Sequence, residues 1–343
     1  MKALIVGHGY MGEIRKRVVD RSPVLELCGL CDPRFTATEV GAECKLFTDY
    51  RTAIDSTCPD ITFVCTPNRF SPDVCIHALE RGSHVFCEKP PGRDLADIRR
   101  IIAAEQANAG LKLMFGFNHR HHPAIIEAKA LIDANRMGRL LWLRGIYGKS
   151  GGQGRQFEDS WRNDPAVSGG GILLDQGIHM LDLFRFFCGD FDVVQGLLAT
   201  QYWDVPVEDN AFVLLRNTTG QIAQLHSSAT LWKHTFHLEL GLEGGYLIAK
   251  GLLSKSGSYG RETLIVGRRP KDGERTAVGN PREEVMYFDE DLSWDLQVNE
   301  LVNCIQDGLP VTDSSSLDAL RVVELIARVY RQNIENVPEG WRI

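Results

Sequence analysis

The fold is decided by the stretch Lys2-Ala-Leu-Ile-Val-Gly7-His-Gly9-Tyr-Met-Gly12. Its apolar run predicts a buried strand, and its three glycines have the G-x-G-x-x-G spacing of a turn from a strand into a helix. In such a turn Gly7 permits the bend, Gly9 lets the backbone approach a pyrophosphate, and Gly12 lets the helix pack on the strand. We therefore expect a helix over residues 10–20 whose N-terminus binds dinucleotide phosphates.

A second strand is expected to end in Asp32, twenty residues after Gly12. An acidic side chain at this place accepts hydrogen bonds from the adenosine ribose hydroxyls and repels a 2′-phosphate. The sequence therefore predicts NAD as the cofactor. Arg34 lies close enough in the chain to offset the repulsion, so NADP stays an alternative.

Strand and helix patterns continue to alternate up to a strand over residues 112–117, which predicts a doubly wound parallel sheet. Thr66-Pro67-Asn68 follows the strand expected over residues 60–65, and Glu88-Lys89 follows the strand His84–Cys87. Pro90 and Pro91 then stop this last strand, because proline has no N–H group for the sheet and fixes its own φ. Ligands bind beyond the carboxyl ends of such strands, so Lys89 is a candidate catalytic group.

The loop Asn118-His-Arg-His-His-Pro123 is expected to close the first domain. Its histidines lack the i, i+4 spacing and the partnering cysteine or carboxylate of metal sites, so we expect no metal. Arg120 is instead expected to contact an oxygen-rich substrate or to help join the two domains.

Residues 172–187 predict a helix that Gly189 ends. Asp175 and His179 are four residues apart and share one face, which Asp182 continues, whereas the apolar residues fall elsewhere. This pattern favours a histidine held as a general base by a carboxylate. The alternative interpretation is a capped helix with a hydrogen-bonded core histidine.

The rest of the second domain shows strand-like alternation from residue 191 to residue 288, after an earlier strand over residues 140–147. It predicts a mainly antiparallel sheet with one face covered by helices and the other available as a subunit interface. Two amphipathic helices follow, near residues 294–306 and 314–331. We expect a nucleotide-binding domain over residues 1–120 and a substrate-binding α/β domain over residues 121–343, with the last helices packing back on the first.

Composition narrows the class of protein further. The chain has 343 residues and a net charge of −7, which argues against nucleic acid as the main partner. No apolar run approaches the roughly 18 residues of a membrane helix, so we expect no membrane association. Nine cysteines without a signal-like segment predict reduced thiols in the cytoplasm, with Cys28 and Cys31 as core residues rather than a metal or redox pair.

Five motifs together resemble those of one family. They occur in the order Gly7-x-Gly9-x-x-Gly12, Thr66-Pro67-Asn68, Glu88-Lys89-Pro90, Asn118-x-Arg120 and Ser168-Gly-Gly-Gly171-(x)3-Asp175-(x)3-His179. The chain is thereby similar to the glucose–fructose oxidoreductase / inositol dehydrogenase / MocA (Gfo/Idh/MocA) family of nicotinamide-dependent oxidoreductases. The resemblance implies a Rossmann domain, a second domain with an open antiparallel sheet, homodimers or homotetramers formed through that sheet, and sugar, inositol or nucleotide-sugar substrates.

The resemblance also implies roles for single residues. The catalytic set falls on Lys89, Asp175 and His179, and the Lys89–Pro90 bond is expected to be cis. The expected cofactor-binding residues are Gly7, Gly9, Tyr10, Met11, Gly12, Asp32, Arg34, Thr66, Pro67, Asn68, Glu88 and Lys89. The expected substrate-binding residues are Asn118, Arg120, Trp161, Arg162, Asp175 and His179.

Two other functions fit the same motifs. One is an NAD-dependent glycoside hydrolase or lyase that oxidises the sugar transiently. The other is a non-catalytic NAD-binding regulator, which would need neither the lysine nor the aspartate–histidine pair.

Overall fold

The computed structural model describes residues 1–35, 44–151, 155–254, 256–270, 281–333 and 341, and the chain forms two compact units. Unit 1 consists of residues 1–117, 164–169 and 294–323. Unit 2 consists of residues 118–163, 170–293 and 324–343. The chain first passes from one unit to the other after Phe117, near the boundary expected at residue 120.

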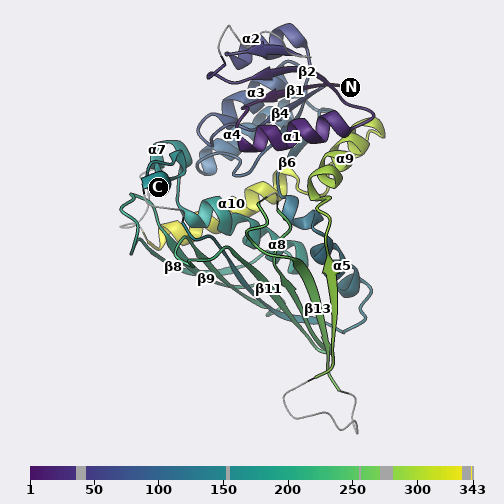
Figure 1. The fold of residues 1–343 in the computed structure, drawn as a ribbon, viewed down its shortest axis with the longest axis vertical. Coiled ribbons are helices and arrows are strands. Elements are labelled where there is room, and N and C mark those ends of the chain that lie inside the picture. Colours follow the sequence, from purple (N-terminus) through teal and green to yellow (C-terminus); the bar gives the residue numbers. More distant parts are fainter. Residues whose placement is uncertain (36–43, 152–154, 255, 271–280, 334–340, 342–343) are drawn as a thin grey trace. The chain divides into compact units, whose positions relative to one another are not determined.

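Unit 1 contains a six-stranded sheet in the order β3-β2-β1-β4-β5-β6, in which every neighbouring pair is parallel (Figure 1). This is the strand order of a Rossmann fold, so the predicted doubly wound sheet is confirmed. Its strands are β1 (Lys2–Val6), β2 (Glu26–Cys31), β3 (Lys45–Phe47), β4 (Ile61–Val64), β5 (His84–Cys87) and β6 (Leu113–Phe115). The helices between them are α1 (Tyr10–Arg21), α2 (Tyr50–Thr57), α3 (Ser71–Glu80) and α4 (Leu95–Ala107).

The core of unit 1 includes a helix from near the end of the chain. α9 (Ser293–Gln306) contributes Val298, Leu301 and Val302, which pack in one cluster with side chains of the parallel strands such as Ile5, Phe63 and Phe86. With the partly buried Ile305, these positions follow the i, i+3, i+4, i+7 pattern of a helix that buries one face. Residues far apart in sequence therefore form one core.

Unit 2 contains an eight-stranded sheet in the order β14-β13-β12-β11-β7-β10-β9-β8, antiparallel except for the parallel pair β7 and β10. The predicted mainly antiparallel sheet is confirmed. Its strands are β7 (Leu140–Gly148), β8 (Val193–Ala199), β9 (Asn210–Arg216), β10 (Ile222–Ser228), β11 (Thr235–Leu242), β12 (Gly245–Lys250), β13 (Glu262–Arg268) and β14 (Glu283–Phe288).

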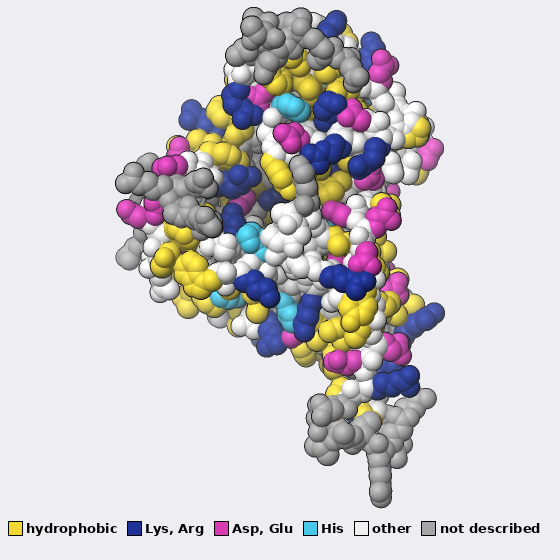
Figure 2. Space-filling view, in the orientation of Figure 1, with side chains coloured by type: hydrophobic (Ala, Val, Ile, Leu, Met, Phe, Trp, Pro, Cys, Tyr) yellow, Lys and Arg dark blue, Asp and Glu magenta, His cyan; other side chains and the backbone are white. Residues whose placement is uncertain are grey.

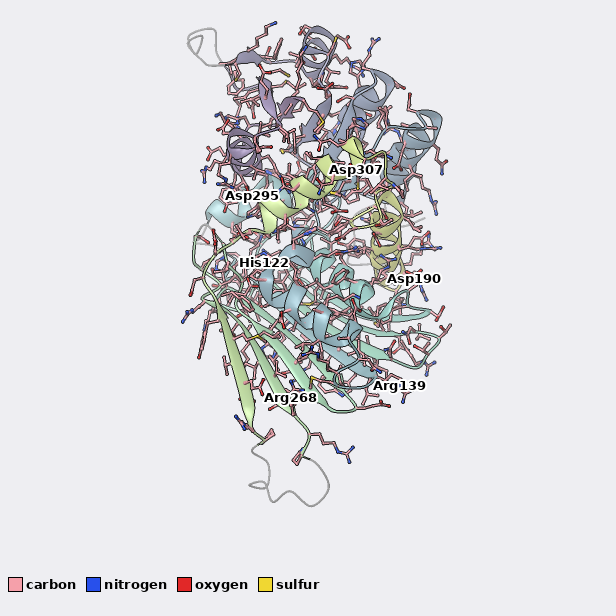
Figure 3. The ribbon with its side chains drawn as sticks, turned by 90° about the vertical axis from the view of Figure 1, so that its right-hand side faces the viewer. His122, Arg139, Asp190, Arg268, Asp295 and Asp307 are labelled. Atoms are coloured by element: carbon pink, nitrogen blue, oxygen red, sulfur yellow. The ribbon has the colours of Figure 1, made fainter. Side chains whose placement is uncertain are left out.

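Two helices of unit 2 lie on one face of this sheet (Figures 1 and 3). α5 (Pro123–Asp133), which His122 precedes as the N-cap residue labelled in Figure 3, packs on β12, β13 and β14, and α8 (Ile178–Cys188) packs on β7 and β10. Unit 2 also contains α6 (Arg155–Glu158) and the 3-10 turns Asn118–His121 and Trp161–Asn163, whereas α7 (Pro165–Ser168) belongs to unit 1 and α10 (Ser316–Arg331) to both units.

The helix expected over residues 172–187 has the predicted extent but is not regular throughout. It begins with a π-helical turn, Leu173–Gly177, continues as α8 and ends before Gly189, whose φ is 77°. A Cβ atom on Gly177 would lie 2.9 Å from the Leu173 side chain and 3.3 Å from that of Ser227 on β10. Glycine thus lets the wider turn lie directly against the sheet, a non-local requirement that the helical period does not reveal.

The helices, the surface charges and the cysteines are those of a typical globular protein. None of the helices in the described ranges is long and apolar enough to cross a membrane. On the face shown in Figure 2, Lys and Arg side chains are interspersed with Asp and Glu side chains among the coloured residues. None of the nine cysteines is in a disulfide, and burial raises the pKa of the Cys31 thiol to about 12, as befits a core residue.

Candidate functional site

The turn between β1 and α1 has the shape that a dinucleotide requires. Gly7 has a φ of +93°, and a Cβ atom there would lie 2.5 Å from the carbonyl oxygen of Cys65. A Cβ atom on Gly12 would lie 2.1 Å from the carbonyl oxygen of Gly7, whereas one on Gly9 would meet nothing within 4 Å. Gly9 is also the N-cap of α1 and has no side chain that could cap the helix. The N-terminus of a helix favours an anion such as a pyrophosphate.

Asp32 directly follows β2 and is 5% exposed. Its carboxylate accepts hydrogen bonds from the backbone N–H of His8 at 2.8 Å and from Nε of Arg34 at 2.8 Å. The Arg34 guanidinium lowers the pKa of this carboxyl to about 2, so the group is ionised at neutral pH. The negative charge expected near the ribose is present, and Arg34 is its partner.

The Thr66-Pro67-Asn68 turn after β4 is held by its own side chains. Oγ1 of Thr66 lies 3.0 Å from Oγ of Ser71, and Nδ2 of Asn68 donates to the carbonyl oxygen of Ser168 at 2.6 Å. Both contacts lie within unit 1. They stiffen a turn at the carboxyl edge of the parallel sheet, the edge at which ligands bind in this class of fold.

Lys89 follows β5, and its bond to Pro90 is cis, as expected. The preceding Glu88 accepts a hydrogen bond from Nε of Arg15 at 2.7 Å, and Nη2 of Arg15 donates to Gln297 at 2.9 Å. Arg15 is fully buried although it lies three residues after Gly12 on α1, where a charged residue normally indicates a solvated face. The sequence reasoning missed this residue, which ties α1 to the turn that carries Lys89.

In unit 2 the carboxylate of Asp175 lies between two cations. Nζ of Lys149 is 3.0 Å from one oxygen, and Nε of Arg162 is 3.4 Å from the other. The Arg162 guanidinium also lies over the ring of Trp161, 4.6 Å from its centroid. The structure therefore brings together three of the predicted residues. The structure adds Lys149, which the sequence analysis did not name. The only sequence signal for Lys149 was its position directly after the strand that forms β7.

His179 lies in the first turn of α8 and is 4% exposed. Its ring stacks on that of His119, with 3.7 Å between centroids and 21° between planes. Tyr147 and Phe236 lie against His119, 5.2 Å and 5.8 Å from it between ring centroids. The candidate base thus stands in an aromatic, largely water-excluded setting, and His119 is a neighbour that the sequence did not single out.

Arg120 and Asp182 form a buried ion pair inside unit 2. Nε and Nη2 of the arginine donate to the two carboxylate oxygens at 2.8 Å and 2.6 Å. Both partners belong to unit 2, and the expectation that Arg120 contacts a substrate or helps to join the domains stays a prediction. Asn118 similarly donates to Oγ of Ser293 at 3.2 Å. Within the described part of the chain, no group of three His, Cys, Asp or Glu side chains is arranged to hold a metal ion.

Comparison with known proteins identifies the family. A model described as an oxidoreductase family with an NAD-binding Rossmann fold matches residues 1–117, and one described as the GFO/IDH/MocA C-terminal domain matches residues 125–248. Together with the parallel sheet and its glycine turn, the first match defines a dinucleotide-binding oxidoreductase fold. The chain belongs to the Gfo/Idh/MocA family, and its N-terminal part is the NAD-binding Rossmann domain of that family.

Two relatives match about half of the chain or less, at about 30% identity. A levoglucosan dehydrogenase of Pseudarthrobacter phenanthrenivorans is 30% identical over 172 residues, which are 50% of this chain and 44% of that protein. An inositol 2-dehydrogenase of Salmonella paratyphi B is 29% identical over 151 residues, 42% of this chain and 45% of its own length. The chain therefore spans less than half the length of these two relatives. A solved levoglucosan dehydrogenase in complex with NADH and levoglucosan has the same fold, with a TM-score of 0.84 at 20% identity over 99% of this chain and 100% of the other.

Proposed function

We propose that this protein transfers a hydride between NAD(H) and a secondary hydroxyl or ketone group of a sugar, an inositol or a nucleotide sugar. The observation that carries the proposal is the cluster in unit 2. There Asp175 lies between Lys149 and Arg162, and the buried His179 lies one turn further along the same helical segment. Acid–base groups gathered in this way suit proton transfer to or from a carbinol oxygen.

Each residue of the set has a separate task. His179 takes the hydroxyl proton as general base, and Asp175 steadies the imidazolium that forms. Lys89 donates a hydrogen bond to the same substrate oxygen and stabilises its developing negative charge. Trp161 and Arg162 contact the substrate beside Asp175, whereas Arg120 supports α8 through Asp182.

The glycine turn and the acidic residue after β2 support NAD as the cofactor. The nicotinamide ring, when bound, accepts or returns the hydride. Gly7, Gly9 and Gly12 leave room for the pyrophosphate, and the ionised Asp32 suits ribose hydroxyls rather than a 2′-phosphate. Arg34, which already lies against this carboxylate, is the residue through which NADP would be accommodated.

The names of the relatives support the substrate class. One is named a levoglucosan dehydrogenase and another an inositol 2-dehydrogenase. Levoglucosan and inositol are both rings that carry several hydroxyl groups. The choice among anhydrosugars, free sugars, inositols and nucleotide sugars is therefore the part of the proposal that a substrate panel must decide.

The test follows the absorbance of reduced nicotinamide when the protein is mixed with NAD and each member of that panel. His179→Ala is expected to lower turnover by roughly 10²–10⁴-fold while NAD binding, measured by calorimetry, is kept. His237→Ala is the control, because its side chain points to the opposite face of the sheet from Phe236 and binds Glu239. Near-normal turnover of the His179 variant would contradict the mechanism, and release of a leaving group without net NADH would favour a hydrolase or lyase.

We also propose that the uncovered face of the eight-stranded sheet forms a homodimer or homotetramer. The strand register places Leu197 opposite Phe212, and Ile222 opposite Trp142, all on that face and all exposed. Leu197→Asp with Phe212→Asp is expected to dissociate the oligomer in analytical ultracentrifugation, whereas the exposed Leu309→Asp outside the sheet is not. A wild-type monomer at micromolar concentration would contradict this interface.

We also propose a cytoplasmic location. None of the nine cysteines is in a disulfide, and four of them are buried, which suits a reducing compartment.

A further inference from the structure

Glu208, just before β9, binds three consecutive backbone N–H groups at the start of the segment that carries Asp175. Its carboxylate accepts from the N–H of Gly171 at 3.0 Å and from that of Leu173 at 3.0 Å. Its own carbonyl oxygen accepts from the N–H of Ile172 at 3.0 Å. These donors stand at the N-terminus of a helical segment, where the backbone itself offers them no partner.

The same carboxylate is held from the other side by α10. The hydroxyl of Tyr330 donates to Oε1 of Glu208 at 2.8 Å, and both side chains are at most 1% exposed. A Cβ atom on Gly170 would lie 2.2 Å from the Tyr330 hydroxyl oxygen, and one on Gly171 would lie 2.2 Å from the carbonyl oxygen of Glu208. The last two glycines of the Ser168–Gly171 motif are therefore required by how closely Glu208 and Tyr330 approach the backbone.

This anchor lies immediately before the candidate catalytic residues in the chain. Leu173 begins the π-helical turn, the N–H of Asp175 donates to the carbonyl oxygen of Gly171 at 2.9 Å, and α8 with His179 continues from the same turn. A shift of the Gly171–Leu173 backbone would therefore displace Asp175 and His179 together. A misplacement of about 1 Å is enough to cost roughly a hundredfold in rate in an oriented active site.

We propose that Glu208, together with Tyr330, is a positioning residue that fixes the start of the helical segment carrying Asp175 and His179. The role rests on the proposed function, because it matters for catalysis only if those two residues act on the substrate. Neither Glu208 nor Tyr330 has to touch substrate or cofactor. Glutamine cannot reproduce these contacts, because both side-chain oxygens of Glu208 accept hydrogen bonds and an amide has one acceptor oxygen.

The test compares Glu208→Gln with Asp209→Asn. Asp209 is the matched control, because it is equally buried and its carboxylate accepts from the backbone N–H groups of another segment, residues 201–203. We expect Glu208→Gln to lower kcat by about 10–100-fold with the NAD dissociation constant unchanged. Asp209→Asn is expected to lower the melting temperature by a similar amount but to leave kcat unchanged. Equal kcat in the two variants would overturn the proposal.

A second measurement needs neither substrate nor turnover. Hydrogen–deuterium exchange, followed by mass spectrometry, is expected to rise in the peptide covering residues 171–179 in Glu208→Gln, and in the peptide covering residues 201–203 in Asp209→Asn. Unchanged exchange over residues 171–179 would overturn the positioning role. If exchange over residues 171–179 rises in Glu208→Gln but the wild-type protein oxidises no member of the panel, the positioning role stands and the proposed function is refuted instead.

If Glu208→Gln does not fold, Tyr330→Phe keeps the proposal testable. It removes one donor of the three that bind the carboxylate and leaves the ring in place. We expect a several-fold loss of kcat and a smaller rise in exchange over residues 171–179. Wild-type values for both measurements would overturn the proposal.

Discussion

Removing the carboxylate of Asp182 tests how much of unit 2 depends on one buried ion pair. The Asp182 side chain is 0% exposed and that of Arg120 is 5% exposed, and two hydrogen bonds of 2.8 Å and 2.6 Å join them. Asp182→Ala would remove this carboxylate from a buried guanidinium. Breaking a buried pair in this way costs about 3–5 kcal/mol, so we expect a loss of that size in the free energy of unfolding.

The assay is urea unfolding at pH 7, followed by circular dichroism and fitted with one transition for each unit. Asp289→Ala is the control, because Asp289 also binds an arginine, Arg261, through two contacts of 2.6 Å and 2.7 Å, but on the surface. Solvent screens such a pair, so its loss is expected to be within experimental error. If the Asp182 and Asp289 variants unfold at the same urea concentration, the reasoning about burial is wrong.

The double variant Arg120→Met with Asp182→Leu separates the charge effect from the packing effect. It removes both charges and fills much of the same volume with apolar atoms, so it is expected to recover at least half of the stability lost in Asp182→Ala. Normal turnover of this double variant would show that Arg120 supports α8 rather than contacting the substrate. A double variant less stable than Asp182→Ala would refute the account of an uncompensated charge.

Three further predictions concern the cofactor turn and the anchor of the catalytic segment. Gly12→Ala is expected to weaken NAD binding by about tenfold or more in calorimetric titration, because its Cβ would lie 2.1 Å from the carbonyl oxygen of Gly7. Asp32→Ala is expected to weaken NAD binding more than NADP binding, and equal losses would contradict its role at the ribose. Burial raises the pKa of Glu208 from 4.5 to about 7, so the native state holds this proton more tightly than the unfolded chain does. The contribution of this group to stability is therefore complete below pH 4.5 and falls by up to about 3 kcal/mol as the pH rises through 7; melting curves of Glu208→Gln are expected to lack that slope.

Elements set by local chemistry were predicted well. The strand His84–Cys87 has the expected limits, since the two prolines after Lys89 end it whatever the rest of the chain does. Asp94 caps α4 by accepting from the N–H groups of Ala96 and Asp97, a contact that depends only on neighbouring residues.

Features that depend on distant partners were not predicted. Arg15 is buried because its guanidinium binds Glu88 and Gln297, which belong to two other parts of the chain. The residues next to it on α1 do not indicate this burial. Glu208 was overlooked for the same reason, since its three backbone partners precede it by more than thirty residues. The π-helical turn escaped prediction because a period of 3.6 residues describes only the backbone hydrogen bonds of a regular helix.

The amino-acid sequence by itself determined the class of the molecule: the parallel sheet, its glycine turn, the acidic residue after β2, and the family to which the chain belongs. These depend on short patterns, whose steric and hydrogen-bonding requirements act over a few residues. Only the tertiary structure decided which charges meet. It placed Lys149 and Arg162 on Asp175, Arg120 on Asp182, and Arg15 on Glu88. An ion pair depends on distance in space, and residues far apart along the chain acquire that distance only when the core has packed.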